Sequence, residues 1–214
     1  MLRVATWNVR SLRDDARGVA AALRGLDADL VCVQEAPRLL GWRTSRVLLG
    51  RRSGLRPLTH ERACGTLLLA GPRVRPLATG TVLLPPRPGL HRRAAVHATV
   101  EVDGGVVVLA CTHLDLDPAA RLDSARRVRA ALPPGPLVLG ADVNDEPGTP
   151  PWQALADGLT DAGDGLGPTF SVVEPRRRID ALLVSPDLRV VDRRLLDAGP
   201  VTDHLGVVAD LEPR

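Results

Sequence analysis

The sequence predicts an α/β fold in which two β-sheets pack against each other and helices flank them. Both halves of the 214-residue chain contain a strand–helix–strand pattern followed by a strand-rich region. The content of 44% hydrophobic and 25% charged residues is ordinary for a globular protein with a substantial core. No linker is long enough to separate two domains, so we expect one domain over residues 1–214.

Short apolar runs bounded by turn residues predict the strands. Three of these runs, Leu30–Val33, Val106–Ala110 and Leu137–Leu139, are continuously apolar, as expected of strands covered on both faces. The segment Asp103–Gly105 reads Asp-Gly-Gly and predicts a hairpin. The predicted strands are Val4–Trp7, Leu30–Val33, Thr66–Leu69, Ala94–Val102, Val106–Thr112, Leu137–Gly140, Ala181–Val184, Arg189–Leu196 and Leu205–Leu211.

Three segments carry helical patterns with recognisable start signals. An aspartate precedes the first two, where its carboxylate can accept hydrogen bonds from first-turn N–H groups. Proline opens the second and precedes the third, and Pro-Pro-Gly ends the second. The predicted helices run from Asp14 or Asp15 to Arg24, from Asp117-Pro118 to Leu132, and from Trp152 to Ala156.

Composition limits the functional classes. All 28 basic residues are arginine and tyrosine is absent, a bias typical of GC-rich coding. The net charge of +3 is therefore compatible with a nucleic-acid partner but does not require one. Cys32 and Cys111 lie in apolar runs and, with Cys64, are expected to be reduced. The absence of a Cys-x-x-Cys pair argues against a thiolate zinc site.

Targeting and nucleotide-binding signals are also missing from the sequence. The N-terminal segment has no signal-peptide core, and no apolar stretch approaches the roughly 20 residues that span a bilayer. Neither a Gly-x-Gly-x-x-Gly turn after a strand nor a Walker loop is present. We therefore expect a cytoplasmic monomer with no membrane span.

Polar side chains collect at the ends of the hydrophobic runs, and this is the most informative feature of the chain. A strand end is where a sheet presents side chains to solvent, so these islands suggest one metal-and-phosphate site assembled from the whole chain. The islands are Thr6-Trp7-Asn8, Gln34-Glu35, Thr112-His113-Leu114-Asp115, Asp142-Val143-Asn144, Arg178-Ile179-Asp180 and Thr202-Asp203-His204.

Asn8 and Glu35 each follow a predicted strand directly and offer an amide oxygen and a carboxylate. Mg²⁺ prefers such hard oxygen donors and usually keeps several waters. If the two strands are adjacent and parallel, the two side chains could share one ion. Other interpretations stay open here, because Asn after a strand is usually a turn former and a strand-end Glu is usually a solvated acid.

Asp142 and Asn144 are two residues apart, so extended backbone places them on the same side. The carboxylate could orient or deprotonate a water, and the amide could hold a phosphate oxygen. The alternative is an Asx-turn that closes the strand. The following residues, Asp-Glu-Pro-Gly, favour a turn in either case.

His113 and His204 each lie at a strand boundary near an aspartate. An imidazole beside a phosphorus atom could stabilise the extra charge of the transition state. Asp180 could hydrogen-bond the far ring nitrogen of His204 and hold its tautomer. Either histidine could instead be a surface or capping residue.

Taken in order, these islands resemble the motifs of the endonuclease/exonuclease/phosphatase (DNase I-like) superfamily. The resemblance extends from about residue 3 to about residue 211, and it lies in the order and spacing of the motifs. It implies a four-layer α/β sandwich with two mixed central β-sheets flanked by helices. The matching segments are Ala5–Arg10, Asp27–Glu35, Cys111–Asp115, Gly140–Asn144, Arg178–Ser185 and Thr202–Val208.

This resemblance implies in-line hydrolysis of a phosphodiester or phosphomonoester, with Mg²⁺ or Mn²⁺ as cofactor. The ion would act as a Lewis acid and charge clamp. The roles carried over are metal binding for Asn8, Glu35 and Asp203, water activation for Asp142, phosphate contact for His113, Asn144 and His204, and support of His204 by Asp180.

The chain departs from the repair nucleases that the resemblance includes. Arg10 stands where apurinic-site nucleases carry an acidic residue, and their active-site tyrosine cannot be present. The middle region, residues 70–91, is short and proline-rich, which leaves little room for loops that grip duplex DNA. These departures argue against a dedicated apurinic endonuclease but not against hydrolysis.

Arg93 and Arg178 could receive flanking phosphates of a substrate, and Trp152 could line the cleft. The alternative is a solvated arginine rim and a tryptophan that does not reach the site. The leading expectation is a metal-dependent phosphodiesterase, in particular a nuclease, with a phosphoester substrate. The alternatives are hydrolysis of a small or lipid phosphoester (phosphoinositide, sphingomyelin or nucleotide) and a catalytically silent binding module.

Overall fold

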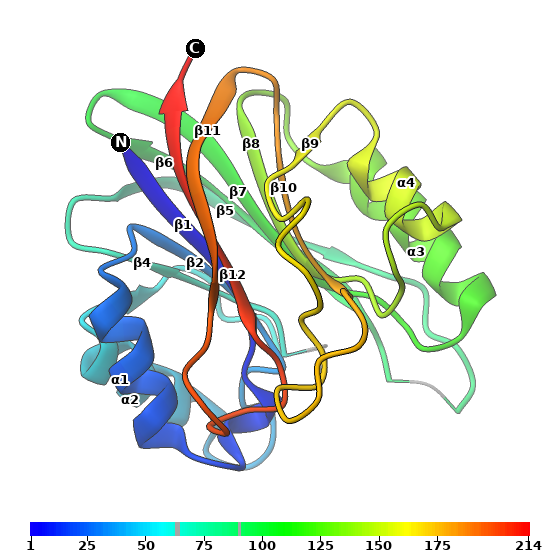
Figure 1. Cartoon of the computed structure of the whole chain (residues 1–214), viewed down its shortest axis with the longest axis horizontal. Coiled ribbons are helices and arrows are strands. Elements are labelled where there is room, and N and C mark those ends of the chain that lie inside the picture. The colour runs from blue at the N-terminus through cyan, green and yellow to red at the C-terminus, as the bar shows by residue number, and fades with distance from the viewer. Residues whose placement is uncertain (63–64, 90) are drawn as a thin grey trace.

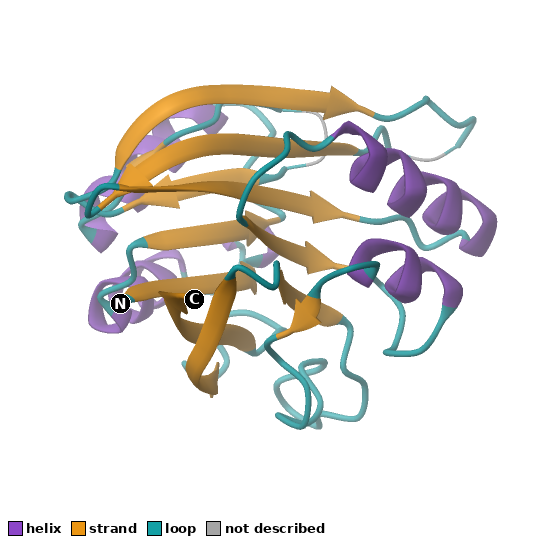
Figure 2. Cartoon of the chain, turned by 90° about the horizontal axis from the view of Figure 1, so that it is seen from above, coloured by secondary structure: helices purple, strands orange, loops and turns teal. Residues whose placement is uncertain are grey.

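In the computed structural model, which describes residues 1–62, 65–89 and 91–214, the chain forms two six-stranded mixed β-sheets with helices outside them (Figures 1 and 2). Sheet A has the strand order β11-β12-β1-β2-β4-β3, and sheet B has the order β5-β6-β7-β8-β10-β9. The predicted four-layer α/β sandwich is confirmed. In chain order the elements are β1 (Leu2–Asn8), η1 (Arg10–Leu12), α1 (Ala16–Leu26), β2 (Leu30–Gln34), α2 (Trp42–Ser53), β3 (Arg56–Pro57), β4 (Leu67–Ala70), β5 (Arg75–Leu83), β6 (Ala94–Val102), β7 (Gly105–His113), α3 (Pro118–Ala131), β8 (Leu137–Asp142), α4 (Pro150–Ala156), β9 (Thr160–Asp161), β10 (Asp180–Val184), β11 (Leu188–Leu196) and β12 (Gly206–Pro213).

Three layers of apolar side chains hold the sandwich together. Strand alternation separates the two faces of β1, so that Val4 lies between the sheets while Ala5 and Trp7 face the outer helices. Helices α1 and α2 cover sheet A, and α3 and α4 cover sheet B through a third cluster that includes Trp152 and Leu155. Figure 1 shows the two helix pairs on opposite sides of the sheets. Covering both faces of each sheet explains why the central strands are continuously apolar.

A parallel strand pair stands at the centre of each sheet. Strand β1 pairs parallel with β2, and β7 pairs parallel with β8. The antiparallel strands β12 and β10 extend these pairs, each starting where its partner ends, so that Asp180 lies opposite Asp142. The same edge of the sandwich therefore receives the carboxyl ends of four strands and the start of two more. The chain termini lie together at the other end (Figure 1).

Local signals in the sequence explain the predicted helices and the hairpin. The Asp15 carboxylate accepts hydrogen bonds from the N–H groups of Arg17 and Gly18 at the start of α1, and Asp117 caps α3 ahead of Pro118. The β6–β7 hairpin turns through the predicted Asp103–Gly105 segment, whose first two residues have φ angles of 51° and 81°. A two-residue turn of this kind requires positive φ, which glycine provides.

Helix α2 and strand β5 are not predicted by the sequence pattern. Helix α2 buries an arginine where an apolar stripe would be expected. Arg46 is 1% exposed, donates from Nε to the carbonyl oxygen of Pro37 at 2.9 Å, and lies 4.7 Å from the ring centroid of Trp42. Strand β5 pairs only with β6, and its exposed edge accommodates Pro76.

Cys32 and Cys111 are buried between the two sheets and are not joined in a disulfide. Cys64 lies outside the described residues. Among the residues that the structure describes, no helix has both the length and the apolar character needed to cross a membrane.

Gly140 allows the two sheets to approach closely, two residues before the end of β8. A Cβ atom at this position would lie 2.5 Å from the Cβ of Cys32 and 2.7 Å from Oγ1 of Thr6 on the facing sheet. We expect Gly140→Ala to lower the free energy of unfolding by about 1–3 kcal/mol, because overpacking must push the sheets apart. Urea unfolding would measure this change.

The matched control is Gly25→Ala in α1, where an added Cβ meets nothing within 4 Å. That substitution is expected to leave stability unchanged or raise it by up to about 1 kcal/mol, since Ala is the better helix former. Equal unfolding midpoints for wild type and Gly140→Ala would contradict the close approach of the sheets.

Candidate functional site

The polar islands of the sequence meet at one edge of the sandwich. Asn8 ends β1, Glu35 follows β2, His113 ends β7 and Asp142 ends β8. Asp180 begins β10, while Asp203 and His204 immediately precede β12. The residues predicted to bind the metal and the phosphate therefore lie on strands that are neighbours within the two sheets. The parallel pairing of β1 with β2 meets the condition under which Asn8 and Glu35 could share an ion.

Asp142 is the centre of the hydrogen-bond network. It is 1% exposed, and its Oδ2 accepts a hydrogen bond of 2.8 Å from Nδ2 of Asn8. The same amide nitrogen lies 3.4 Å from Oε1 of Glu35. Oδ1 of Asp142 accepts the backbone N–H of Asn144 at 3.0 Å, so the predicted Asx-turn is present. The turn and the functional interpretation are therefore compatible.

The loops that carry these side chains have left-handed backbone. Glu35 and Asn144, each just beyond a parallel strand, have φ angles of 50° and 56°. The segment Arg10–Leu12 has φ angles of 43°, 57° and 58° and is tied to β2 by the N–H of Ser11, which donates to the Glu35 carbonyl at 2.7 Å. Non-glycine residues rarely adopt this conformation, and such strain concentrates at functional sites.

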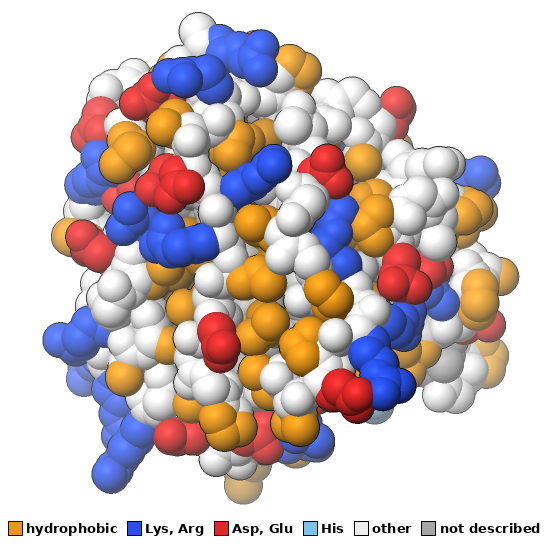
Figure 3. Space-filling model, viewed as in Figure 1, with side chains coloured by type: hydrophobic (Ala, Val, Ile, Leu, Met, Phe, Trp, Pro, Cys, Tyr) orange, Lys and Arg blue, Asp and Glu red, His pale blue; other side chains and the backbone are white. Residues whose placement is uncertain are grey.

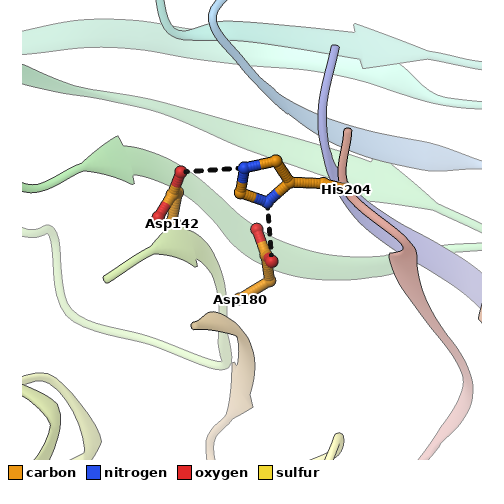
Figure 4. Close-up of side chains that lie close together, drawn as sticks. All are labelled: Asp142, Asp180 and His204. Carbon is orange, nitrogen blue, oxygen red and sulfur yellow. Dashed lines mark hydrogen bonds and ion pairs between the residues drawn. The ribbon is translucent and has the colours of Figure 1, made fainter. Parts of the chain in front are cut away.

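His204 and Asp180 form a buried pair, with Asp142 on the other side of the imidazole ring (Figure 4). Nδ1 of His204 lies 2.9 Å from Oδ2 of Asp180, and Nε2 lies 3.9 Å from Oδ2 of Asp142. The backbone N–H of Asp180 donates to Oγ1 of the buried Thr169 at 3.3 Å, and Nε1 of Trp7 donates to the His204 carbonyl at 2.9 Å. These contacts orient the ring so that Nε2 faces the site.

The surrounding carboxylates control the charge of His204. Burial disfavours its charged form, but Asp180, Asp142 and Asp203 outweigh this effect and raise the pKa of His204 to about 9. At neutral pH the ring is therefore an imidazolium whose Nε2–H can donate to an anion. Burial also acts to raise the pKa of Asp142, but its interactions with His113 and with the His204 imidazolium, and the hydrogen bonds from Asn8 and the Asn144 N–H, lower it below its ordinary value. Asp142 is thus a carboxylate.

His113 differs from His204 in its charge. Burial lowers the pKa of His113 below its ordinary value, although Asp142 opposes the change, so the ring is neutral at pH 7. Its Nε2 lies 3.0 Å from Nδ2 of Asn144 and 3.4 Å from Oδ2 of Asp142. A neutral and a charged imidazole therefore flank one carboxylate.

Asp203 lies at the rim of the site, where it pairs with the arginine that replaces the acidic residue of the repair nucleases. Oδ2 of Asp203 is 3.3 Å from Nε of Arg10, and Oδ1 is 4.0 Å from Nε2 of His204. Arg10 also contacts both carboxylate oxygens of Asp14 at 3.2 Å. A guanidinium group therefore neutralises this side of the site, and metal binding by Asp203 stays a prediction.

Two sets of residues have ligand chemistry suited to a cation. Glu35 and Asp142 both face the Asn8 amide and are the hard oxygen donors that Mg²⁺ prefers. Ligand atoms of Asp142, Asp180 and His204 also lie within 4.8 Å of one another and could hold a metal ion. Asp180 already binds Nδ1 of His204, so the Asn8–Glu35–Asp142 side fits a cation better. Rotation of the Asn8 amide would turn its oxygen toward that ion.

A pocket of about 430 Å³, here called the central pocket, opens over these residues. Asp142, Glu35 and both histidines line it, together with Arg93, whose Nε is 3.6 Å from Oδ2 of the buried Asp115. Sequence reasoning missed several lining residues because none belongs to a polar island at a strand end. They are Ser11, Arg13, Arg38, His91, Leu116 and Phe170. The ring centroid of Phe170 is 4.9 Å from that of His204.

Trp152 and Arg178, for which a substrate-binding role was predicted, lie outside the central pocket. Trp152 is 4% exposed and belongs to the apolar cluster beneath α4. Arg178 lies 4.7 Å from the centroid of that ring, and its Nη2 is 2.8 Å from Oδ2 of Asp161. Neither residue lines the central pocket, because both are held on the helix side of sheet B; the adjacent Arg177 lines it instead.

Solved structures with the same fold cover the whole chain. A mannosyl-6-phosphatase of Bacteroides thetaiotaomicron has a TM-score of 0.85 at 18% identity, with 99% of this chain and 100% of that chain covered. D. rerio TDP2 complexed with a single-strand DNA product has a TM-score of 0.79 at 18% identity, with 99% and 98% covered. An endonuclease/exonuclease/phosphatase of Beutenbergia cavernae has a TM-score of 0.77 at 27% identity, with 99% and 71% covered.

A search of curated proteins finds no significant match. The sequence profile described as the Endonuclease/Exonuclease/phosphatase family matches residues 5–204, a range that contains every strand-end residue of the site. The superfamily resemblance of the motifs is thus confirmed by a match over nearly the whole chain. The chain therefore belongs to the Endonuclease/Exonuclease/phosphatase family.

Proposed function

We propose that the chain is a divalent-metal-dependent phosphoester hydrolase that cleaves a phosphodiester by in-line attack of water. The observation that carries this proposal is Asp142, a buried carboxylate with a neutral imidazole on one side and an imidazolium on the other. A base beside a fixed positive charge is what in-line attack on phosphorus requires. The mannosyl-6-phosphatase and the DNA-bound TDP2 of the same fold support a phosphoester substrate.

Each side chain of the site has a separate role in the proposed hydrolysis. Asp142 accepts a proton from the attacking water as the water oxygen bonds to phosphorus and the opposite P–O bond breaks, and the leaving alkoxide takes a proton from solvent. Asn8 and the Asn144 N–H hold the Asp142 carboxylate in position. The Nε2–H of His204 donates to a phosphate oxygen as negative charge develops, while Asp180 keeps the ring oriented. His113 and Asn144 line the pocket beside a second oxygen of the phosphate. Asn8 and Glu35 would hold a Mg²⁺ or Mn²⁺ ion, which would supply Lewis-acid polarisation of the phosphate.

The geometry favours a small phosphoester over a long nucleic acid. The central pocket, at about 430 Å³, has the size of a small-molecule site, and on the face drawn in Figure 3 arginine side chains are interspersed with acidic and apolar ones and do not form a broad positive surface. Backbone binding to nucleic acid depends on such a surface. The nuclease alternative is favoured by Arg93 and Arg177 in the pocket wall and by the DNA-bound relative.

Hydrolysis of bis(p-nitrophenyl) phosphate and of plasmid DNA, measured side by side with Mg²⁺, Mn²⁺ or EDTA, separates these functions. We expect metal-dependent cleavage of the small diester with little plasmid nicking. Nicking that disappears in Asp142→Asn would establish the nuclease. If neither substrate is hydrolysed and no metal binds, the protein is a binding module without catalytic activity.

Metal binding has a readout that does not depend on activity. A cation that binds only the folded state, present at a concentration of 100 times its Kd, raises the free energy of unfolding by about 2.7 kcal/mol. For a chain of this length, that corresponds to a rise in Tm of roughly 5–10 °C. We expect Mg²⁺ or Mn²⁺ to give such a rise in the wild type and Glu35→Gln to abolish it. Differential scanning calorimetry in EDTA and in metal would measure both.

The control is Glu212→Gln at the far end of β12, which makes the same chemical change away from the site. It should keep the metal-induced rise in Tm. An undiminished rise in Glu35→Gln would remove Glu35 from the metal site.

A further inference from the structure

A second pocket of about 560 Å³ continues from the central pocket toward α2. The two cavities share the lining residues Ser11, Arg13, Arg38 and His91 and therefore adjoin each other. We call the second cavity the Leu/Arg pocket and define it by Leu39, Leu40 and Leu48 together with Arg13, Arg38 and Arg52.

The leucines give this pocket an apolar wall that solvent reaches. Leu39, Leu40 and Leu48 are 69%, 104% and 40% exposed, and they occupy the loop before α2 and its outer face. Large apolar side chains grouped beside an active site mark a ligand surface more often than scattered ones do. Burial of this surface requires an apolar group on the ligand.

The arginines of the pocket are available to bind an anion. No hydrogen bond or ion pair joins the side chain of Arg13, Arg38 or Arg52 to another described residue. This sets them apart from Arg10 and Arg93, which face carboxylates. Arg13 and Arg38 stand at the junction of the cavities, next to the position of the reacting phosphate, and a guanidinium fork suits phosphate oxygens.

The other residues of the lining favour an alkyl group over a sugar or a nucleobase. The described residues of the Leu/Arg pocket contain no acidic or amide side chain that would bind sugar hydroxyls. His91 contributes the single ring, so the stacking platform that a nucleobase uses is missing from these residues. An alkyl chain next to a phosphate satisfies both the leucines and the arginines.

We propose that the Leu/Arg pocket binds the apolar chain of an amphiphilic phosphate ester, whose phosphate lies in the central pocket beside Arg13 and Arg38. This inference rests on the proposed function, because it assigns the phosphate to that site. It makes the leucines the determinant of specificity among phosphoesters.

Calorimetric titration of the Asp142→Asn protein with ethyl, butyl, hexyl and octyl phosphate, each kept below its micellar concentration, tests the inference without turnover. Each buried methylene should tighten Kd about three- to fourfold, because it contributes roughly 0.8 kcal/mol. Leu48→Ser in the same background should flatten this dependence on chain length while leaving Kd for ethyl phosphate unchanged. Arg38→Gln should weaken every member of the series by at least about tenfold.

The control is Leu77→Ser on β5, a leucine of similar exposure far from the pocket. It should leave the whole series unchanged. A Kd that does not vary with chain length, or that varies equally in Leu48→Ser, would overturn the inference. Binding to phosphatidylcholine vesicles containing phosphatidic acid, without binding of monomeric octyl phosphate, would also overturn it and assign the leucines to a membrane surface.

The two proposals can fail separately in these experiments. Hydrolysis of the small diester with no dependence of binding on chain length would leave the proposed function and remove the Leu/Arg pocket. If the wild-type protein hydrolyses no phosphoester but binds alkyl phosphates in a chain-length-dependent way, the proposed function is rejected and the proposed role of the Leu/Arg pocket is retained.

Discussion

Replacement of Asp142 by asparagine is expected to lower kcat by at least about 10²-fold, the scale on which a general base acts. Asparagine has the shape of aspartate but cannot accept a proton from water. The Asn144 N–H would still find an oxygen at this position, so the turn after β8 should persist. Steady-state hydrolysis of bis(p-nitrophenyl) phosphate would measure the loss, and circular dichroism would verify the fold.

The comparison for this variant is Asp187→Asn, an exposed carboxylate in the turn before β11 at the far end of sheet A. Its activity should equal that of the wild type. Near-normal turnover by Asp142→Asn would mean that another group activates the water, and the assignment of the site would then be abandoned.

Replacement of His204 by alanine is expected to cost at least about 10²-fold in kcat, comparable with the loss of an oxyanion donor. In the proposed mechanism, the imidazolium is the charged donor to the phosphate. Its removal also leaves Asp180 buried without its 2.9 Å partner. Because an unpaired buried carboxylate destabilises the fold, activity must be measured below the unfolding temperature of the variant.

Asp180→Asn distinguishes charge stabilisation from a purely structural role of this pair. The raised pKa of His204, about 9, means that the imidazolium is present below that pH and is lost as pH rises through it. The rate should therefore fall on the alkaline side. Without the Asp180 carboxylate this alkaline limb should move to lower pH. An unchanged pH profile in Asp180→Asn would show that protonation of His204 does not govern the rate.

Much of the site could be predicted from the sequence because it depends on local signals and on topology. An aspartate before a helix, an Asp-Gly-Gly turn and an apolar run each act within a few residues. Asn8, Glu35, Asp142 and His204 stand next to such runs, and strand ends in a two-sheet sandwich meet at one edge. The order of the polar islands, together with the family resemblance, therefore predicted that these four side chains lie at one edge.

The tertiary structure decided what depends on partners distant in the chain. Trp152 follows a polar island and Arg178 belongs to one, yet packing against sheet B directs both side chains away from the pocket. The Leu/Arg pocket exists because η1 and the loop before α2 meet beside the strand ends. Whether a side chain faces the site or the core is set by packing across these contacts, and no local pattern contains that information.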